Sequence, residues 1–404
     1  MKQTRRPQKA PKRSRPTPKH LKHPKPPSET PKTGPEEPTV NLTEVVKTGL
    51  EHARAGRLFA AEERLAEALS NTSHPDIAAN LAAVYQLQGR PLEGAAVLRA
   101  HIKPGTVHPV GWNTLGVCLL DQGALPEAAA CFRVAAEQNP RGLIPLVHLH
   151  AALFDDRDTA RSRAALEAAA AIERNDPTVR FHLGVLWGLL APAAADRHHA
   201  VLPPEAAAWK SSWRFVLDHR DAETRFFGCT AATLRFAAAL ATGPGSVLEL
   251  GVRFGTSTRL LRDATAGEVH GFDTFAGLPL AWHQVPAGAY STGGTVPALG
   301  DDIVLHKGLF SHTLPGWVEH HPQPIQLLHV DCDLYESTAE ALRILAPLVR
   351  PGTVLLFDEY LMNPHWEHDE HKALVEAGTA LGWTWRYAAF SLFSHQAVVV
   401  VTHT

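Results

Sequence analysis

The stretch SVLELGVRFGTS, residues 246–257, decides the fold of the C-terminal half of this chain. A short apolar run ends in a glycine-rich turn, and a Thr-Ser pair then opens a helix-like segment. This order predicts a buried strand, a tight turn and a helix. Gly251 and Gly255 let the main chain approach a ligand closely at the helix N-terminus. Their spacing differs from the GxGxxG pattern that holds a dinucleotide pyrophosphate, which favours a nucleoside without phosphates.

An acidic residue ends the next predicted strand. Asp273 stands 22 residues beyond Gly251, where its carboxylate can accept hydrogen bonds from ribose hydroxyls. Either feature alone occurs in many α/β folds, but together they predict an adenosyl cofactor. The predicted cofactor-binding residues are Glu249, Gly251, Gly255, Thr256, Ser257 and Asp273.

Strand-like and helix-like segments alternate through this half of the chain, which predicts an α/β fold with a doubly wound, mainly parallel sheet. Two final strand-like segments, 384–393 and 397–401, are separated by three residues, so we expect an antiparallel pair at the sheet edge. The other expected strands are 246–252, 268–274, 303–310, 325–333 and 353–360, and the expected helices are 257–264, 337–349 and 371–381.

Carboxylates follow two of these strands directly. Asp331 and Asp333 are two positions apart, so they project to one side at the carboxyl edge, where open α/β sheets bind ligands. Asp358 and Glu359 end the next strand. If the two strands are neighbours, four carboxylates meet, and a hard divalent cation such as Mg2+ would relieve their repulsion. The alternative is that some of them cap the following helices.

Five motifs, in order, resemble the macrocin O-methyltransferase family over roughly residues 225–404. They are ELGV at 249–252, FDTFAGLP at 272–279, KGLF at 307–310 with TLP at 313–315, HVDCDLYEST at 329–338, and DEY at 358–360. Members of that family are class I methyltransferases that methylate hydroxyls, often on deoxysugars of antibiotics, with Mg2+ assistance. The resemblance implies a class I methyltransferase fold and S-adenosylmethionine as the methyl donor.

The same resemblance implies roles for the carboxylates. Asp331, Asp358 and Glu359 would ligate the metal. Asp331 and Asp333 would be the catalytic residues, with Asp333 as the candidate general base. The family usually has two aspartates before the tyrosine of the last motif, whereas here the second is Glu359. A metal-bound hydroxyl would be stabilised as its alkoxide while a carboxylate takes the proton. The Gly- and Pro-rich segment 275–302, with Trp282 and Tyr290, is expected to close over cofactor and acceptor.

A repeat of about 34 residues precedes this half. The unit from Pro109 to Pro140 resembles the tetratricopeptide repeat, and looser copies lie before and after it. We therefore expect helical repeats over 41–191, a Pro-rich linker over 192–210 and the methyltransferase domain over 211–404. Residues 1–40 are rich in Pro, Lys and Arg, which predicts a disordered basic tail. Two roles for this tail stay open: it solubilises the protein, or it tethers the protein to an anionic partner.

The composition excludes several classes of protein. No stretch of about 18 apolar residues is present, so we expect a cytoplasmic protein without a membrane span. The first 40 residues hold 11 basic side chains against 3 acidic ones, so the rest is acidic and nucleic acid is expected only at the tail. The four cysteines have no CxxC spacing and are expected to be buried thiols.

Two other classes compete with this interpretation. A nucleic-acid methyltransferase would carry an Asn/Asp-Pro-Pro-aromatic motif where Asp333-Leu334-Tyr335-Glu336 stands. A tetratricopeptide scaffold with a degenerate methyltransferase domain would lack the glycine-rich turn and the carboxylates. The expected partners are a hydroxyl-bearing sugar, glycan or small-molecule acceptor, together with a protein partner or a second copy of the chain at the repeats.

Overall fold

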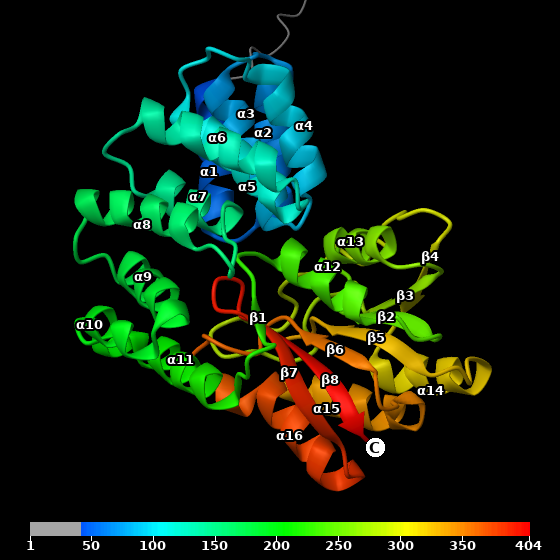
Figure 1. Cartoon of the computed structure of the whole chain (residues 1–404). Helices are drawn as coiled ribbons and strands as arrows, with labels where there is room; N and C mark the ends of the chain where they lie inside the picture. The colour runs from blue at the N-terminus through cyan, green and yellow to red at the C-terminus, as the bar shows by residue number, and fades with distance from the viewer. Residues whose placement is uncertain (1–41) are drawn as a thin grey trace, which may run out of the picture. The chain divides into compact units, whose positions relative to one another are not determined.

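Helices in antiparallel pairs form the first half of the protein in a computed structural model, which describes residues 42–404 (Figure 1). The predicted basic tail, 1–40, lies outside the described residues. The repeat helices are α1 (Leu42–Arg54), α2 (Leu58–Ser70), α3 (Pro75–Leu87), α4 (Pro91–His101), α5 (Pro109–Asp121), α6 (Leu125–Gln138), α7 (Ile144–Ala152), α8 (Ala160–Ile172) and α9 (Pro177–Leu190). Proline opens several of them, where its missing N–H costs nothing because the first helical amides have no intrahelical acceptor.

Glycines give the repeats their geometry. Gly56, Gly89 and Gly123 stand in the turns within the first three helix pairs with φ of 71°, 77° and 72°, a conformation that costs other residues energy. Gly116 of α5 faces Phe132 of α6, and an added Cβ would lie 2.4 Å from the Phe132 ring. The helices can therefore pack closely around buried Phe132. This confirms the tetratricopeptide-like fold predicted for this half.

Three short helical turns and one longer helix lead from the repeats to the sheet. They are η1 (Pro192–Ala194), α10 (Asp196–His199), η2 (Pro204–Ala206) and α11 (Ala207–His219). The predicted linker thus contains helical turns. Trp213 and Val216 of α11 are buried in the same cluster as Phe390 of the sheet. The domain boundaries proposed from the sequence stay a prediction, because residues 42–404 form one compact unit.

The second half is an eight-stranded sheet in the order β1-β7-β8-β6-β5-β2-β3-β4. All neighbouring strands are parallel except β8, which runs antiparallel to β6 and β7. The predicted mainly parallel sheet with its antiparallel hairpin is therefore confirmed, and a two-residue strand, β1, pairs outside β7. The strands are β1 (Arg225–Phe226), β2 (Ser246–Leu250), β3 (Val269–Asp273), β4 (Ile303–Lys307), β5 (Ile325–Val330), β6 (Val354–Phe357), β7 (Thr384–Ser391) and β8 (Gln396–His403).

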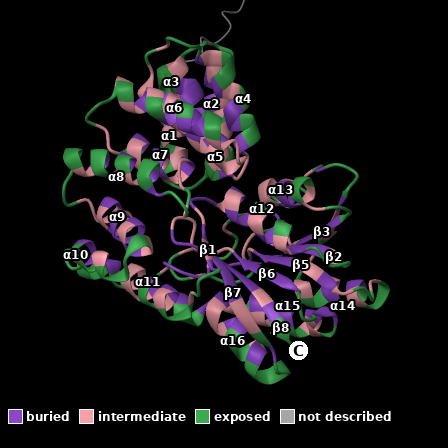
Figure 2. Cartoon of the chain, in the orientation of Figure 1, coloured by how far each residue is buried: buried purple, intermediate pink, exposed green. Residues whose placement is uncertain are grey.

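Helices cover both faces of the sheet (Figure 1). α12 (Thr230–Leu240) and α13 (Thr256–Ala264) lie on one face, and α14 (Phe310–His320), α15 (Tyr335–Leu345) and α16 (Glu370–Leu381) lie on the other; η3 (Ala346–Leu348) and η4 (Trp366–His368) are single turns. Successive residues of β6 enter different cores, Leu355 and Phe357 on one face and Val354 and Leu356 on the other. The central strands β2, β3, β5 and β6 are accordingly buried almost throughout (Figure 2).

Two further expectations can be compared with the structure. Cys118, Cys131, Cys229 and Cys332 are all free and buried, as predicted. Among residues 42–404, every helix is too short or too polar to cross a membrane.

The turn between β7 and β8 contacts the repeat helices. The ring of Phe393 lies 4.8 Å from His150 on α7, 4.7 Å from His182 on α9 and 5.1 Å from Phe154, measured between ring centroids. His150 and His182 each keep one buried ring nitrogen without a hydrogen-bond partner. The repeats thus surround the end of this hairpin with apolar and imidazole side chains.

This enclosure predicts acid-sensitive stability. Burial lowers the pKa of His150 to about 4, so the unfolded chain takes up a proton below about pH 6.5 while the folded chain does not. The free energy of unfolding is expected to fall as the pH drops from 6.5 towards 4, by about 2 kcal/mol at pH 5 for this group alone. Urea unfolding at pH 7.5 and pH 5.0 measures this effect. Between these two pH values, the free energy of unfolding of His150→Phe should fall by about 2 kcal/mol less than that of wild type. The same substitution at exposed His403 is the control, and equal losses in His150→Phe and wild type would refute the prediction.

Candidate active site

A cavity of about 560 Å³ lies at the carboxyl ends of β2, β3, β5 and β6. Open α/β sheets bind ligands at this edge, and the volume lies within the range of small-molecule sites. The main groups in its wall come from the strand ends, from the segment after β3, and from α14 and α15. They are Gly251, Arg253, Asp273, Leu278, Tyr290, Phe310, Asp331, Asp333, Glu336, Ser337, Glu340, Asp358 and Glu359.

The glycine-rich loop, residues 251–256, forms one side of this cavity. Gly251 has φ of 94°, and its N–H donates to the Phe272 carbonyl at 2.9 Å. A Cβ there would lie 1.7 Å from the main-chain oxygen of Asp331, so only glycine fits between the ends of β2 and β5. Asp273 also lines the cavity, and its Oδ2 accepts the N–H groups of Val252 and Arg253 at 2.9 and 2.7 Å. The Asp273 carboxylate therefore shapes the loop as well as facing the cavity.

The other predicted cofactor-binding residues lie behind the wall. Glu249 is fully buried, where His329 Nδ1 lies 2.8 Å from its Oε1 and the Thr258 hydroxyl donates to its Oε2. Gly255 packs against Leu299, and Ser257 follows in the first turn of α13. The Thr256 hydroxyl donates to the carbonyl of Gly89, in the repeats, at 2.7 Å. Direct contact of these four residues with a cofactor stays a prediction.

The predicted acidic cluster is assembled in the same cavity. β5 and β6 are parallel neighbours with Val330 opposite Phe357, so Asp331 and Asp333 meet Asp358 and Glu359. Burial and the carboxylate of Asp358 raise the pKa of Asp331 well above its usual range. Burial, with the carboxylates of Glu359 and Asp358, raises the pKa of Asp333 to about 7. The cluster is therefore a set of mutually repelling acids rather than a set of helix caps.

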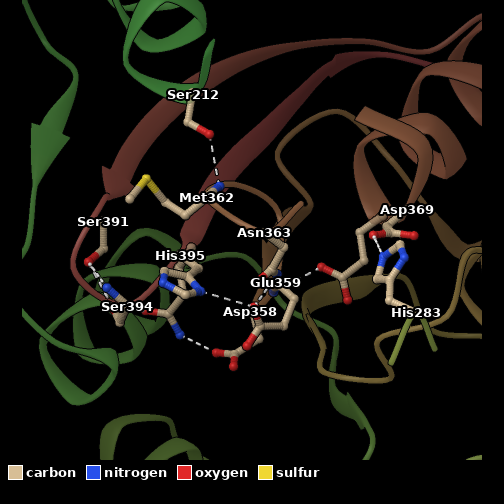
Figure 3. Close-up of polar contacts among 12 residues, drawn as sticks. Ser212, His283, Asp358, Glu359, Met362, Asn363, Asp369, Ser391, Ser394 and His395 are labelled. Atoms are coloured by element: carbon tan, nitrogen blue, oxygen red, sulfur yellow. Dashed lines mark hydrogen bonds and ion pairs between the residues drawn. The ribbon is translucent and has the colours of Figure 1, made fainter. Parts of the chain in front are cut away.

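Polar side chains from β8 and its turn hold the second pair of carboxylates. The Gln396 amide donates to Asp358 Oδ1, and His329 Nε2 lies 3.7 Å from the same oxygen. Glu359 Oε2 accepts the Asn363 amide and faces His395 Nδ1 at 3.2 Å, so Figure 3 shows Glu359 between these two residues. Burial opposes a charge on His395, yet Glu359 raises the pKa of that imidazole.

These hydrogen bonds bear on the expected metal ion. Among residues 42–404, no three His, Cys, Asp or Glu side chains are arranged to hold one. Hard oxygen donors suited to Mg2+ are present at Asp331 and Asp358, but Glu359 is taken up by Asn363 and His395. The side chains in this arrangement do not fit a three-carboxylate metal centre.

Sequence reasoning missed the groups around the acids. Glu370 of α16 is fully buried, with Oε2 accepting the N–H of Glu359 at 3.2 Å and Oε1 unpartnered. Burial and the carboxylate of Asp333 raise the pKa of Glu370 well above its usual range. Arg253 is the one basic side chain among the lining residues. Gln396 and His395 could have been found only from the pairing of Phe357 with Ala397, which brings β8 beside β6.

The segment expected to act as a lid lines the cavity. Leu278, Leu280 and Tyr290 are in its wall together with Asp333. His283 Nε2 lies 2.8 Å from Asp369 Oδ2, which anchors the segment beside α16 (Figure 3). The segment is therefore placed beside the acidic cluster, and its closure over ligands stays a prediction.

Comparison with known proteins agrees with this geometry. Residues 248–360, from the glycine-rich loop to the second pair of carboxylates, match a family model described as a methyltransferase domain. No curated protein matches the chain.

Several solved structures are similar to parts of the chain. The calicheamicin methyltransferase CalS11 is 23% identical over 42% of this chain and 77% of its own, with a TM-score of 0.35. The O-methyltransferase NovP is 22% identical over 43% and 79%, with a TM-score of 0.34. The TPR protein TTC0263 of Thermus thermophilus is 18% identical over 44% and 98%, with a TM-score of 0.36. Scores at this level do not extend these proteins' activities to this chain.

Proposed function

Because residues 248–360 match a methyltransferase domain, we propose that the chain is an S-adenosylmethionine-dependent O-methyltransferase that acts on a hydroxyl. The proposed acceptor is a sugar or another glycosylated molecule. One observation carries the proposal: the glycine-rich loop and Asp273 share a cavity with Asp331 and Asp333. The residues proposed to bind the cofactor and the acidic groups proposed to accept a proton therefore face the same space.

The fit of the cofactor rests on the loop. Gly251 brings the ends of β2 and β5 together, and Asp273 stands at the end of β3, where a ribose could reach its carboxylate. S-adenosylmethionine, when bound, supplies a methyl group on a positively charged sulfur, which is already an activated electrophile. The acidic lining suits that positive charge.

The remaining task of the protein is to position a hydroxyl and accept its proton. Asp333 is 9% exposed and lies in the cavity wall, so its carboxylate is the proposed general base. Asp331 is proposed to orient the acceptor beside it. The apolar groups Leu278, Leu280 and Phe310 offer a surface for the acceptor's carbon skeleton and exclude water from the reacting atoms.

The first test is calorimetric titration with S-adenosylmethionine, followed by transfer of labelled methyl groups to a panel of sugar hydroxyls. Saturable binding at one site and transfer to oxygen are expected. The same assay is run after EDTA treatment and after adding Mg2+. A mechanism through the carboxylates alone predicts rates within about twofold of each other, whereas the metal-assisted mechanism predicts a loss of about 100-fold or more.

Each outcome has a distinct meaning. Loss of transfer in EDTA, restored by Mg2+, would show that Glu359 leaves Asn363 and His395 to complete a metal site. No binding of S-adenosylmethionine to wild type would overturn the proposal and favour the scaffold interpretation. Transfer to nitrogen of a nucleobase instead of a hydroxyl would favour the nucleic-acid methyltransferase.

A further inference from the structure

The glycine-rich loop is held by the repeats as well as by the sheet. Arg253 Nη2 donates to the carbonyl of Leu87 at 2.7 Å, and the Thr256 hydroxyl donates to the carbonyl of Gly89 at 2.7 Å. Both acceptors belong to the repeat-2 turn, defined here as Leu87–Arg90, which joins α3 to α4. Both ends of the segment 253–256 are thus tied to the main chain of one turn.

The middle of the segment packs on the same turn. The Arg90 guanidinium lies 5.5 Å from the centroid of the Phe254 ring, and Phe59 of α2 lies 6.3 Å from it. Arg90 is itself fixed by Glu62 at 2.9 Å and Glu93 at 3.0 Å. An arginine held by two carboxylates forms a stable platform for an aromatic ring.

The other repeats provide an internal comparison. Gly56, Gly89 and Gly123 occupy equivalent turns with nearly equal φ. A Cβ on Gly56 would meet nothing within 4 Å, whereas one on Gly89 would lie 3.4 Å from Arg253. Gly123 instead accepts a hydrogen bond from Arg235 of α12, at 2.8 Å. Of these three turns, the second is the one that touches the glycine-rich loop.

Arg253 connects the repeat-2 turn to the cavity, because it contacts both. Its main-chain N–H donates to Asp273, its guanidinium lies 5.3 Å from the Tyr290 ring, and it lines the cavity. Its φ is 52°, which an arginine adopts only when its surroundings hold it there. The guanidinium bond to Leu87 is one of the restraints that do so.

We infer that the repeat-2 turn is a positioning element of the cofactor site: it fixes the loop conformation in which Asp273 and the 251–256 main chain receive S-adenosylmethionine. This inference rests on the proposed function. Loosening the turn therefore weakens cofactor affinity without removing any group from the cavity. On this inference the repeats contribute to cofactor binding through the loop, and a contact between the repeats and the substrate is not required.

The test is a double-mutant cycle between Arg90→Ala and Phe254→Ala, because neither side chain lines the cavity. Each single variant should raise the Kd for S-adenosylmethionine by about tenfold, and the double variant should be little worse than either. Phe254→Tyr keeps the ring and should restore wild-type affinity. In Arg90→Ala the transfer rate at saturating cofactor should stay within about twofold of wild type, since the catalytic carboxylates are unchanged.

A matched control lies elsewhere in the repeats. Arg163 stacks on Trp187 at 4.2 Å and pairs with Glu167 at 3.7 Å, so Arg163→Ala removes the same kinds of contact away from the loop. It should leave the Kd unchanged. Suppose that Arg90→Ala and Arg163→Ala lower the melting temperature equally and that both keep the wild-type Kd. The turn would then have a structural role only, and the inference is overturned.

A second measurement does not depend on the cofactor. Amide hydrogen exchange of peptides spanning 250–258 should become faster in ligand-free Arg90→Ala than in wild type, by about tenfold, and remain unchanged in Arg163→Ala. Equal exchange in all three proteins would also overturn the inference. Failure of wild type to bind S-adenosylmethionine would instead count against the proposed function itself.

Discussion

Replacing Asp333 by Asn is expected to lower the rate of methyl transfer by about 10²- to 10⁴-fold, the usual contribution of a general base. The amide cannot accept the hydroxyl proton, but it has the size of the carboxylate. Asn also tolerates the positive φ of 61° found at this position, so the backbone should not move. Single-turnover transfer at saturating S-adenosylmethionine, with its Kd measured in parallel, would separate loss of chemistry from loss of binding.

Glu340→Gln is the control for Asp333→Asn. Glu340 of α15 lines the same cavity, and its substitution also replaces a carboxylate by an amide of the same size. Glu340 is not proposed to take the proton. Its rate should stay within about tenfold of wild type. A rate in Asp333→Asn equal to that in Glu340→Gln would assign the general base elsewhere, with Asp331 the next candidate in the cavity.

The second large effect is expected from Gly251→Ala, which should abolish measurable S-adenosylmethionine binding and cost about 2 to 5 kcal/mol of stability. The new methyl group would lie 1.7 Å from the Asp331 oxygen, and the residue would keep a φ of 94°. The ends of β2 and β5 would have to separate, which moves the loop and the acidic cluster together. Urea unfolding and calorimetric titration measure the two effects.

Gly243→Ala serves as the comparison for that variant. A Cβ at Gly243 meets nothing within 4 Å, so the same chemical change should leave both stability and binding close to wild type. Normal cofactor affinity in Gly251→Ala would mean that the strand ends are not the cofactor site.

Much of the sheet could be predicted because its strands are locally encoded. The apolar runs at 246–250, 325–330 and 354–357 end in glycine or carboxylates, and these ends fall where the cavity forms. Parallel neighbours place their carboxyl ends at one edge, so adjacency of β5 and β6 was enough to bring four acids together. The repeats were visible for the same reason, since each unit encodes its own helix pair.

What the sequence concealed depends on distant pairing. His395 and Gln396 meet Glu359 and Asp358 across more than thirty residues because β8 enters the sheet antiparallel beside β6. No local pattern marks a histidine in a hairpin turn as a partner for a carboxylate. Likewise, the sequence predicts that Thr256, at the start of α13, binds the cofactor, yet its hydroxyl donates to the carbonyl of Gly89 in the repeats.

The hydrogen-bond acceptors in the repeat-2 turn are main-chain carbonyls. The contact therefore tolerates substitutions in the turn but not insertions or deletions. Arg253 and Thr256 bond to the backbone of Leu87 and Gly89, so the side chain at position 87 can be exchanged without losing either bond. Inserting or deleting one residue between α3 and α4 would instead displace both carbonyls at once. Surface side chains of the repeats can therefore change without affecting the contact, whereas the number of residues between α3 and α4 is constrained by the glycine-rich loop that bonds to them.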